Sequence, residues 1–515
     1  MIRVMKVISL AIFVLTFLTF SISAGLPLKE GEASPPPMPR LWDDEAIQTI
    51  EVPLANAGMS PVHVDSAYYY SLGQIVQIYK SYPIYGPGKE PPGYIDWLKQ
   101  QEPENIFDPS KLKTMEDWVK AGERVFDFGP VFQGTMGPNE VRNPEWYKKT
   151  AVPLTRDGIM PFARYVIRKK GEIEIGNVAC ATCHTRVMSD GTIIKGAQGN
   201  FPFDRSTAFN FRDHYSKANN KERYTERNRE LMLAFFDTPW LKDNPNGRLG
   251  RMSIEEIAQA HEAIPPGVMA RHRSSLFFPP QIPDLIGLKD WRYLDHTGLV
   301  RQRSIADLMR YAALTQGGDN YARFGDYIPF EPFQGKLPDA KDEERYSDEQ
   351  LYAVALYLYS LKPPPNPNKF DQQAGRGKRV FERAGCATCH TPPLYTNNKL
   401  TPASGFTPPE DHFKKFHIMN VSVGTDPRLA LSSRRGTGYY KVPSLRGLWY
   451  RGPFEHNGSV ATLEDWFDPK RLKDDYVPTG FLGVGVKNRA VKGHPYGLQL
   501  SERERSDLIA FLKTL

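Results

Sequence analysis

The sequence predicts a mainly α-helical protein in which one helical unit occurs twice, the first copy with large insertions, after an irregular N-terminal extension. Three observations predict this fold class. A Cys-x-x-Cys-His pentad occurs twice, similar segments flank each pentad at both ends, and proline and glycine are concentrated ahead of the first copy. A length of 515 residues leaves room for about two to four domains of ordinary size.

Residues 1–24 form a predicted secretory signal peptide. Arg3 and Lys6 precede an apolar run over 7–20, and small residues at 21–25 offer a cleavage site. The apolar run is short for a membrane span, although an uncleaved anchor is the alternative. We therefore expect a periplasmic or secreted protein with no membrane span after cleavage of the signal.

Residues 25–110 form the predicted extension. Proline and glycine are frequent there, as in the stretches 34–39 and 85–93. Such a composition is typical of segments without regular structure, so we expect this part to wrap over the surface. A fully disordered leader would not explain Tyr79 and Trp97.

The two copies are predicted at 111–361 and 375–515, with a proline-rich linker at 362–374. Each begins with a Gly-x-Arg-Val-Phe segment and ends with a segment that runs from serine to leucine over the same length. The serines are predicted helix N-caps, because acidic residues and then apolar residues at helical spacing follow them. The glycines would let two helices cross closely.

The two pentads contain all four cysteines of the chain and have the spacing for covalent attachment of haem c. In such a pentad the two thiols bind the haem vinyl groups and the adjacent imidazole binds the iron. The residues concerned are Cys180, Cys183 and His184 in the first pentad and Cys386, Cys389 and His390 in the second. The alternatives are a zinc site or a disulfide, but the cysteine pairs lie about 200 residues apart and each precedes a histidine. We therefore expect two covalently bound haem c groups.

An opening and a closing helix that cross beside such a pentad form the arrangement of class I cytochrome c. We therefore expect two cytochrome-c-like haem domains, of which the first is elaborated. Fifty-four residues lead from Phe126 to Cys180, against five from Phe381 to Cys386. Substrate handling is expected in the first domain for this reason. The formal charge of +7 is mild and no dense stripe of Lys and Arg occurs, so no nucleic-acid partner is expected.

The second copy resembles the bacterial di-haem cytochrome c peroxidase superfamily. The motifs are Val-Pro-Ser-Leu-Arg-Gly at 442–447, Gly-Pro-Phe-Glu-His-Asn-Gly-Ser-Val at 452–460 and Thr-Leu-Glu at 462–464. The long first half, the pentad separation, Gly-His-Pro-Tyr-Gly at 493–497 and the terminal Leu-Lys-Thr-Leu are most similar to the di-haem rubber-oxygenase branch. The resemblance covers about 110–515.

The resemblance implies different roles for the two haems. The N-terminal haem, with His184 as proximal ligand, would activate peroxide or dioxygen, and the C-terminal haem, with His390, would relay electrons. A tryptophan often stands between the haems, and Trp291 has the matching position, with a packed core indole as the alternative. A calcium ion is also implied, held by the backbone carbonyls of Lys441 and Pro443.

Several residues are candidates for the sixth ligand of the C-terminal haem. No methionine follows Met419, which departs from the short peroxidases. His494 fits best, because it matches the distal histidine of the rubber-oxygenase type. His456 is the second choice and Met419 the third; His412 and His417 are the remaining candidates. Two imidazoles would give a lower haem potential than histidine with methionine.

Candidate catalytic residues lie between 291 and 303. His296 has three open roles: a resting ligand of the first haem, a distal acid or base, or a structural cap of a turn. Neighbouring charged side chains could position a peroxide or stabilise charge on its leaving oxygen. These are Arg292, Asp295, Arg301 and Arg303, and the residues that we select are His296, Trp291, Arg292 and Arg301.

We expect an oxidoreductase that receives electrons from a small redox protein or a quinol-linked cytochrome and acts on peroxide, dioxygen or an olefin. The alternative is a di-haem electron-transfer cytochrome with no substrate chemistry of its own. The aromatic pairs at 235–236 and 277–278 are compatible with an apolar substrate channel. Aromatic side chains are more often part of an ordinary core.

Overall fold

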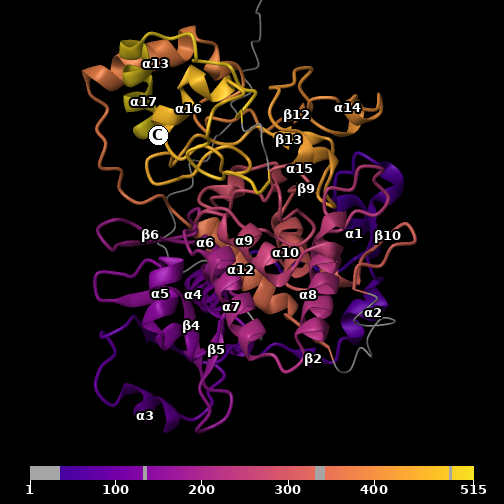
Figure 1. Ribbon diagram of the computed structural model, residues 1–515, viewed down its shortest axis with the longest axis vertical. Helices are drawn as coiled ribbons and strands as arrows, with labels where there is room; N and C mark the ends of the chain where they lie inside the picture. Colours follow the sequence, from indigo (N-terminus) through magenta and orange to yellow (C-terminus); the bar gives the residue numbers. More distant parts are fainter. Residues whose placement is uncertain (1–34, 131–135, 331–342, 486–489) are drawn as a thin grey trace, which may run out of the picture.

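The computed structural model describes residues 35–130, 136–330, 343–485 and 490–515 (Figure 1). The predicted signal peptide therefore lies outside the described residues. Within these ranges, no helix has the length and apolar character that a bilayer crossing requires.

The regular structure is mainly helical, with short strands (Figure 1). The α-helices are α1 (Asp44–Ile50), α2 (Ser66–Ser71), α3 (Tyr94–Lys99), α4 (Met115–Asp127), α5 (Pro144–Thr150), α6 (Cys180–His184), α7 (Phe203–Lys217), α8 (Lys221–Phe236), α9 (Ile254–Glu262), α10 (Ile305–Thr315), α12 (Asp348–Ser360), α13 (Gln372–Arg383), α14 (His412–Lys415), α15 (Arg428–Leu431), α16 (Leu463–Trp466) and α17 (Glu502–Lys513). The strands are β1 (Pro61–Val62), β2 (Gln74–Ile75), β3 (Ser81–Tyr85), β4 (Ile159–Val166), β5 (Glu174–Gly176), β6 (Thr185–Val187), β7 (Ile193–Lys195), β8 (Tyr293–Leu294), β9 (Val300–Arg301), β10 (Arg323–Phe324), β11 (Glu344–Arg345), β12 (Leu400–Pro402) and β13 (Tyr439–Lys441).

The predicted helix pairs are present in both halves: α4 packs on α12, and α13 packs on α17. A Cβ atom added to Gly122 would lie 2.0 Å from a backbone oxygen of α12, and one added to Gly377 would lie 1.9 Å from a backbone oxygen of α17. The predicted close crossing at the two glycines is thus confirmed. Ser347 and Ser501 cap α12 and α17 as predicted, each accepting a backbone N–H of the first turn.

Two small sheets position the pentads. Strands β3, β4 and β5 form an antiparallel sheet in that order, and β4 supports α6, because the Thr182 hydroxyl donates to the Phe162 carbonyl at 2.8 Å. Strands β12 and β13 pair antiparallel, with Leu400 opposite Lys441. This pairing brings the segment after the second pentad against the segment that leads to Pro443.

Helices α7, α8 and α9 of the first half form a second hydrophobic core, which includes residues of the second half such as Leu429 and Tyr440. Phe236, Phe277 and Phe278 are 2%, 5% and 1% exposed in this core. These aromatic side chains fill the interior, so they do not line the apolar channel with which their sequence was compatible.

The N-terminal extension differs from the prediction. It contains α1, α2, α3 and β1 to β3, and its side chains belong to the main core. Trp42 is fully buried and stacks on Tyr69 with ring centres 4.1 Å apart. Tyr69 comes from α2, so the extension packs against itself as well as on the first half. The apolar residues between the prolines, such as Ile50 and Ile78, outweigh the proline content because they are fully buried.

Candidate haem centres

The first pentad forms the short helix α6, and its imidazole is held from one side. The Nδ1–H of His184 donates to the Pro283 carbonyl at 3.1 Å, so Nε2 is the nitrogen left to bind iron. Burial, together with the charge of Arg271, lowers the pKa of His184 to about 4. The ring is therefore neutral, as iron ligation requires. Such a carbonyl contact is the usual means of orienting a metal-binding histidine.

The second pentad has the same arrangement. The Nδ1–H of His390 points at the carbonyls of Tyr395 and Pro443, each at 3.1 Å. Burial lowers the pKa of His390. The Pro443 carbonyl, one of the two groups implied for calcium, is therefore an acceptor for His390.

All four cysteines are free thiols. Burial raises the pKa of Cys180 to about 12 and that of Cys183 and Cys386 to about 11. A redox-active Cys-x-x-Cys pair has a lowered thiol pKa instead. Free, buried thiols beside an oriented imidazole fit covalent haem attachment.

His494 faces His390 across a cavity. The two ring centres are 6.3 Å apart, and the planes differ by 52°. Two imidazoles bound to opposite sides of one iron, with metal–nitrogen bonds of about 2 Å, would place the ring centres roughly 6 Å apart. In the described part of the chain, the buried Nδ1 atom of His494 has no hydrogen-bond partner. This geometry fits the ligand pair expected for the second haem.

Arg471 holds the loop that carries His494. Its buried guanidinium donates to the carbonyls of Val491, Gly493 and His494 at 2.6, 3.0 and 2.8 Å. His494 has φ of +43°, and its own N–H donates to the Val423 carbonyl at 2.6 Å. Backbone contacts on both sides therefore fix the imidazole in place.

The other sixth-ligand candidates have different partners. His456 lies in the same cavity, but its Nδ1–H pairs with Glu455, and its ring centre lies 4.6 Å from that of Tyr440 with the planes tilted by 36°. Met419 accepts the Asn397 amide at 3.2 Å through its sulfur. The other two candidates are further from this role, because His412 contacts the Tyr439 hydroxyl at 2.9 Å and His417 is exposed.

Known proteins match parts of this chain. The sequence matches no family model. It is 31% identical over 147 residues to the methylamine utilization protein MauG of Methylorubrum extorquens, covering 28% of this chain and 34% of the relative. It is 28% identical over 168 residues to the cytochrome-c peroxidase IdrP1 of a Pseudomonas strain, covering 29% and 41%. For the cytochrome c551 peroxidase of Nitrosomonas europaea the identity is 26% over 148 residues, covering 29% and 35%.

Over these stretches the chain is similar to a methylamine utilization protein and to cytochrome c peroxidases. The chain spans about a third to two-fifths of the length of these curated relatives. The matches do not distinguish the rubber-oxygenase branch. A solved structure of a MauG-like protein associated with microbial copper homeostasis overlaps with a TM-score of 0.28 at 17% identity, covering 56% of this chain and 88% of that one. An overlap of that size supports no conclusion about the fold.

The cavity beside the second pentad extends toward the first half. Its lining includes Trp291, His296 and Lys441 as well as His390 and His494. The ammonium of Lys441 lies 4.3 Å from the centre of the Trp291 ring. Burial lowers the pKa of Lys441 to about 8, partly offset by Asp295, so the ammonium is charged at neutral pH. Trp291 is thus part of the cavity wall and not only core packing.

His296 contacts the segment that carries the hydrogen-bond partner of His184. Its Nε2–H donates to the Gln281 carbonyl at 2.7 Å, and Gln281 is two residues from Pro283, the partner of His184 Nδ1. The roles of His296 as a resting ligand, a distal acid–base or a structural cap stay predictions.

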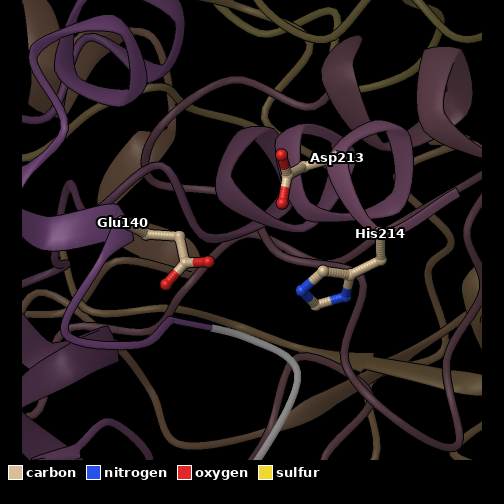
Figure 2. A group of neighbouring side chains, drawn as sticks. All are labelled: Glu140, Asp213 and His214. Carbon is tan, nitrogen blue, oxygen red and sulfur yellow. The ribbon is translucent and has the colours of Figure 1, made fainter. Parts of the chain in front are cut away.

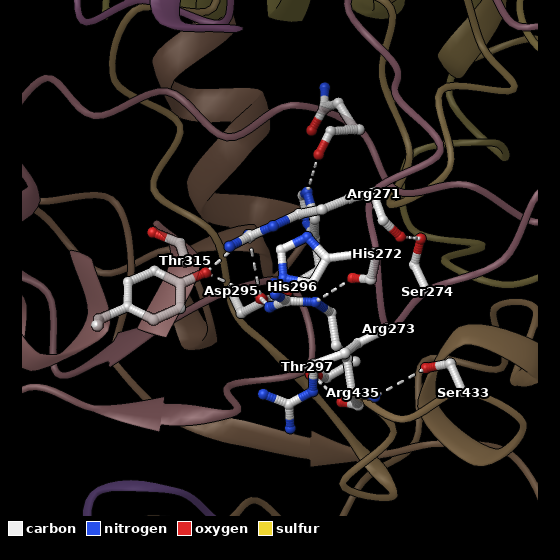
Figure 3. Close-up of polar contacts among 12 residues, drawn as sticks. Arg271, His272, Arg273, Ser274, Asp295, His296, Thr297, Thr315, Ser433 and Arg435 are labelled. Atoms are coloured by element: carbon white, nitrogen blue, oxygen red, sulfur yellow. Dashed lines mark hydrogen bonds and ion pairs between the residues drawn. The ribbon is translucent and has the colours of Figure 1, made fainter. Parts of the chain in front are cut away.

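A polar network surrounds the buried Asp295 (Figure 3). Asp295 accepts the Tyr311 hydroxyl at 3.0 Å and pairs with Arg435 and, at 3.6 Å, with Arg271. Burial opposes ionisation of Asp295, but Arg435 and Arg271 outweigh it and hold its pKa well below the usual range. Arg271 is close enough to His184 for its charge to lower the pKa of that imidazole. A charged Arg271 is thus near His184 of the first pentad.

Two of the selected arginines are not part of this network. Arg292 is exposed, and Arg301 stacks over Phe416 with 5.5 Å to the ring centre. Neither lines the cavity. Arg303, which precedes α10, pairs with Asp307 of that helix at 2.9 Å. The sequence analysis did not select Arg271, Tyr311 or Arg435; the Arg-His-Arg run at 271–273 was the one local signal.

Three side chains with metal-ligand spacing occur elsewhere. The ligand atoms of Glu140, Asp213 and His214 lie within 4.8 Å of one another (Figure 2). Asp213 is paired with Lys217 at 2.7 Å, and Glu140 accepts the Gly137 N–H at 3.0 Å, so both carboxylates have partners. Over the described ranges, no such group contains a cysteine.

Proposed function

We propose that this chain is a periplasmic or secreted di-haem c-type oxidoreductase in which the N-terminal haem activates peroxide or dioxygen and the C-terminal haem relays electrons. The supporting observation is the asymmetry of the two pentads. His494 faces His390 at ligand distance, whereas among the described residues no second imidazole is in ring contact with His184. The first iron would thus have an open position, and the second would not.

The protein side chains would tether and orient the two groups. Cys180 and Cys183 would hold one haem and Cys386 and Cys389 the other. The two Nδ1–carbonyl hydrogen bonds fix the proximal rings and increase the basicity of Nε2. When bound, each haem supplies an iron centre that exchanges single electrons, and the first also supplies a binding position for peroxide or dioxygen.

Arg271 replaces Arg292 and Arg301 as the candidate that stabilises negative charge on a bound oxygen. Its guanidinium donates to the Tyr311 hydroxyl oxygen at 2.8 Å, and that hydroxyl donates to Asp295. The network is buried, so its charges act in a medium of low dielectric. The ion pair with Asp295, at 3.6 Å, keeps Arg271 oriented.

The proposal also includes the substrate, the electron donor and a calcium ion. The chain would be most similar in activity to the rubber-oxygenase branch, with an olefin as the alternative substrate to peroxide. Its donor would be a small redox protein or a quinol-linked cytochrome. A calcium ion would bind the backbone carbonyls of Lys441 and Pro443, and the Pro443 carbonyl would also accept the hydrogen bond of His390. Metal analysis of the dialysed holoprotein tests whether calcium is bound.

The experiment uses holoprotein with both haems attached. EPR spectra of the resting and one-electron-reduced protein, with and without carbon monoxide, report the ligation of each iron. We expect one permanently six-coordinate centre and one that binds carbon monoxide. Two permanently six-coordinate centres that bind neither carbon monoxide nor peroxide would instead identify an electron-transfer cytochrome. Turnover of hydrogen peroxide compared with polyisoprene and a small olefin then decides the substrate class.

A further inference from the structure

The two proximal histidines donate hydrogen bonds to proline carbonyls that have similar neighbours in the chain. His184 donates to Pro283, and His390 donates to Pro443, both at 3.1 Å. Two residues before each proline stands a residue that contacts His296: Gln281 in the first half and Lys441 in the second.

His296 joins these two segments. Its Nε2–H donates to the Gln281 carbonyl at 2.7 Å. Its own carbonyl accepts the backbone N–H of Lys441 at 2.9 Å. A continuous chain of covalent and hydrogen bonds therefore runs between the proximal rings. In order, it passes through His390, Pro443, Lys441, His296, Gln281, Pro283 and His184.

The surroundings hold His296 in this bridging position. Its N–H donates to Asp295 Oδ1 at 2.8 Å, and Asp295 is anchored by Arg435 of the second half. Asp295 has φ of +70° at the turn between β8 and β9, which directs the following histidine into the cavity wall. Burial keeps the imidazole neutral, with a pKa lowered to about 4. The bridging imidazole of His296 is thus uncharged, so its charge adds no reorganisation energy to electron transfer.

Trp291 offers the other route across the cavity, but its electrostatic setting opposes oxidation. The Lys441 ammonium lies 4.3 Å from the ring centre, a cation–π distance. A positive charge at this distance from the indole destabilises a second positive charge on the ring. Oxidation of Trp291 as an intermediate step is therefore disfavoured compared with an indole that has no cation beside it.

We propose that electrons pass between the two haem centres along the hydrogen-bonded chain through His296, which acts as a positioning residue that joins the two proximal histidines. The proposal rests on the proposed function, since it requires both haems. One electron leaves the C-terminal centre, which is oxidised, and reduces the N-terminal centre. No proton is transferred, because every hydrogen bond of the chain keeps its donor.

The test compares electron equilibration between the haems in wild type and in His296→Leu, which removes the contact to Gln281 but keeps the backbone bond to Lys441. One haem is reduced in a fast pulse and the redistribution is followed optically, while midpoint potentials are measured by redox titration. We expect a several-fold slower equilibration in His296→Leu with unchanged potentials. His296→Gln, whose amide nitrogen can donate to the same carbonyl, should recover most of the rate.

Further variants separate this route from others. His412→Leu removes a different buried histidine of the second half, outside the chain, and should keep the wild-type rate. Trp291→Phe should slow the transfer less than His296→Leu. A wild-type rate in His296→Leu, or a larger effect of Trp291→Phe, would overturn the proposal. If His296→Leu does not fold, His296→Asn, whose amide is too short to reach Gln281, decides in its place. Absence of any equilibration in wild type would instead contradict the proposed function.

Discussion

The histidines of the two haem regions differ in protonation because each ring has a different partner. Burial lowers the pKa of His184, His296 and His494 to about 4, and these rings contact carbonyls or face the cavity. For His456, burial also opposes protonation, but the Glu455 carboxylate outweighs it and raises the pKa. A ring that ligates iron must be neutral, so the contact with Glu455, which favours the charged form of His456, favours His494 as the ligand.

Replacing His494 by alanine should remove the sixth ligand of the second haem. We expect the low-spin signal of that centre to be lost and a carbon monoxide complex to form there, because no other described imidazole faces His390. Optical and EPR spectra of the holoprotein measure both effects. His456→Gln is the matched control and should keep the low-spin spectrum. An unchanged spectrum in His494→Ala would assign ligation to another residue.

The pair of His456 and Glu455 should make stability fall at alkaline pH. The pKa of His456 is raised above its unfolded value of about 6.5, so the stabilisation is fully present below that pH and is lost as pH rises through the folded pKa. Urea unfolding at pH 6 and pH 9 measures this loss of stability. The loss between the two pH values should be smaller in His456→Gln than in wild type. The charged and polar groups that face His456 are Glu455, Thr425, Asp426, Arg428 and Tyr440. Equal losses in both proteins would contradict the pair as the cause.

At the scale of elements, two pairs of crossing helices frame the pentads. In each pair one glycine allows the helix axes to approach, and an aromatic contact lies one turn further along. Phe126 is 5.2 Å from Tyr357 and Phe381 is 5.4 Å from Phe511 between ring centres. Both halves have this arrangement with different aromatic pairs. We therefore infer that the close approach of the backbones, and not a specific side-chain pair, determines how the helices cross.

Gly377→Ala should therefore destabilise the C-terminal helix pair. The new Cβ would lie 1.9 Å from the Asp507 carbonyl oxygen, so the helices must separate, at a cost of about 1–3 kcal/mol. Gly375→Ala on the same helix is the control, since its nearest neighbour, a Phe370 ring carbon, is 4.0 Å away. Alanine there should stabilise by up to about 1 kcal/mol through helix propensity. Thermal unfolding of both variants checks the opposite signs, and equal effects would contradict the close approach.

The sequence predicted the features that depend on local pattern. The pentads, the serine caps and the crossing glycines are each recognisable within about a dozen residues. The chain of contacts through His296 was not predictable, because its links are backbone carbonyls of Gln281, Pro283 and Pro443, which any residue type could supply. Arg435 was missed because its partner Asp295 lies 140 positions away. The N-terminal extension was misjudged because proline content was weighted above the apolar residues between the prolines.

For the whole molecule, the two halves are joined by buried polar contacts. Arg435 pairs with Asp295, and Gln198 of the first half donates to the Pro453 carbonyl at 3.1 Å. Gln281, which carries the bridge to His296, donates its N–H to the His456 carbonyl at 2.8 Å. The second half forms one end of the molecule (Figure 1), so these contacts fix the relative position of the two pentads. The interface is therefore part of the electron route as well as of stability.

Asp295→Asn should loosen this interface. Asparagine keeps the shape and tolerates the positive φ of the site, but it leaves the buried guanidinium of Arg435 and the partly buried one of Arg271 without their shared carboxylate, which costs about 3–5 kcal/mol. Asp290→Asn is the matched control, because Asp290 also joins the halves through Arg446, at 3.7 Å, yet both side chains are exposed. A surface pair of this kind contributes about 0–1 kcal/mol. Calorimetry of the holoprotein should show a single transition in wild type and in Asp290→Asn, and a lower or divided transition in Asp295→Asn. Equal unfolding temperatures in the two variants would mean that the halves are held together by their apolar contacts, and the buried charges would then serve only to orient His296.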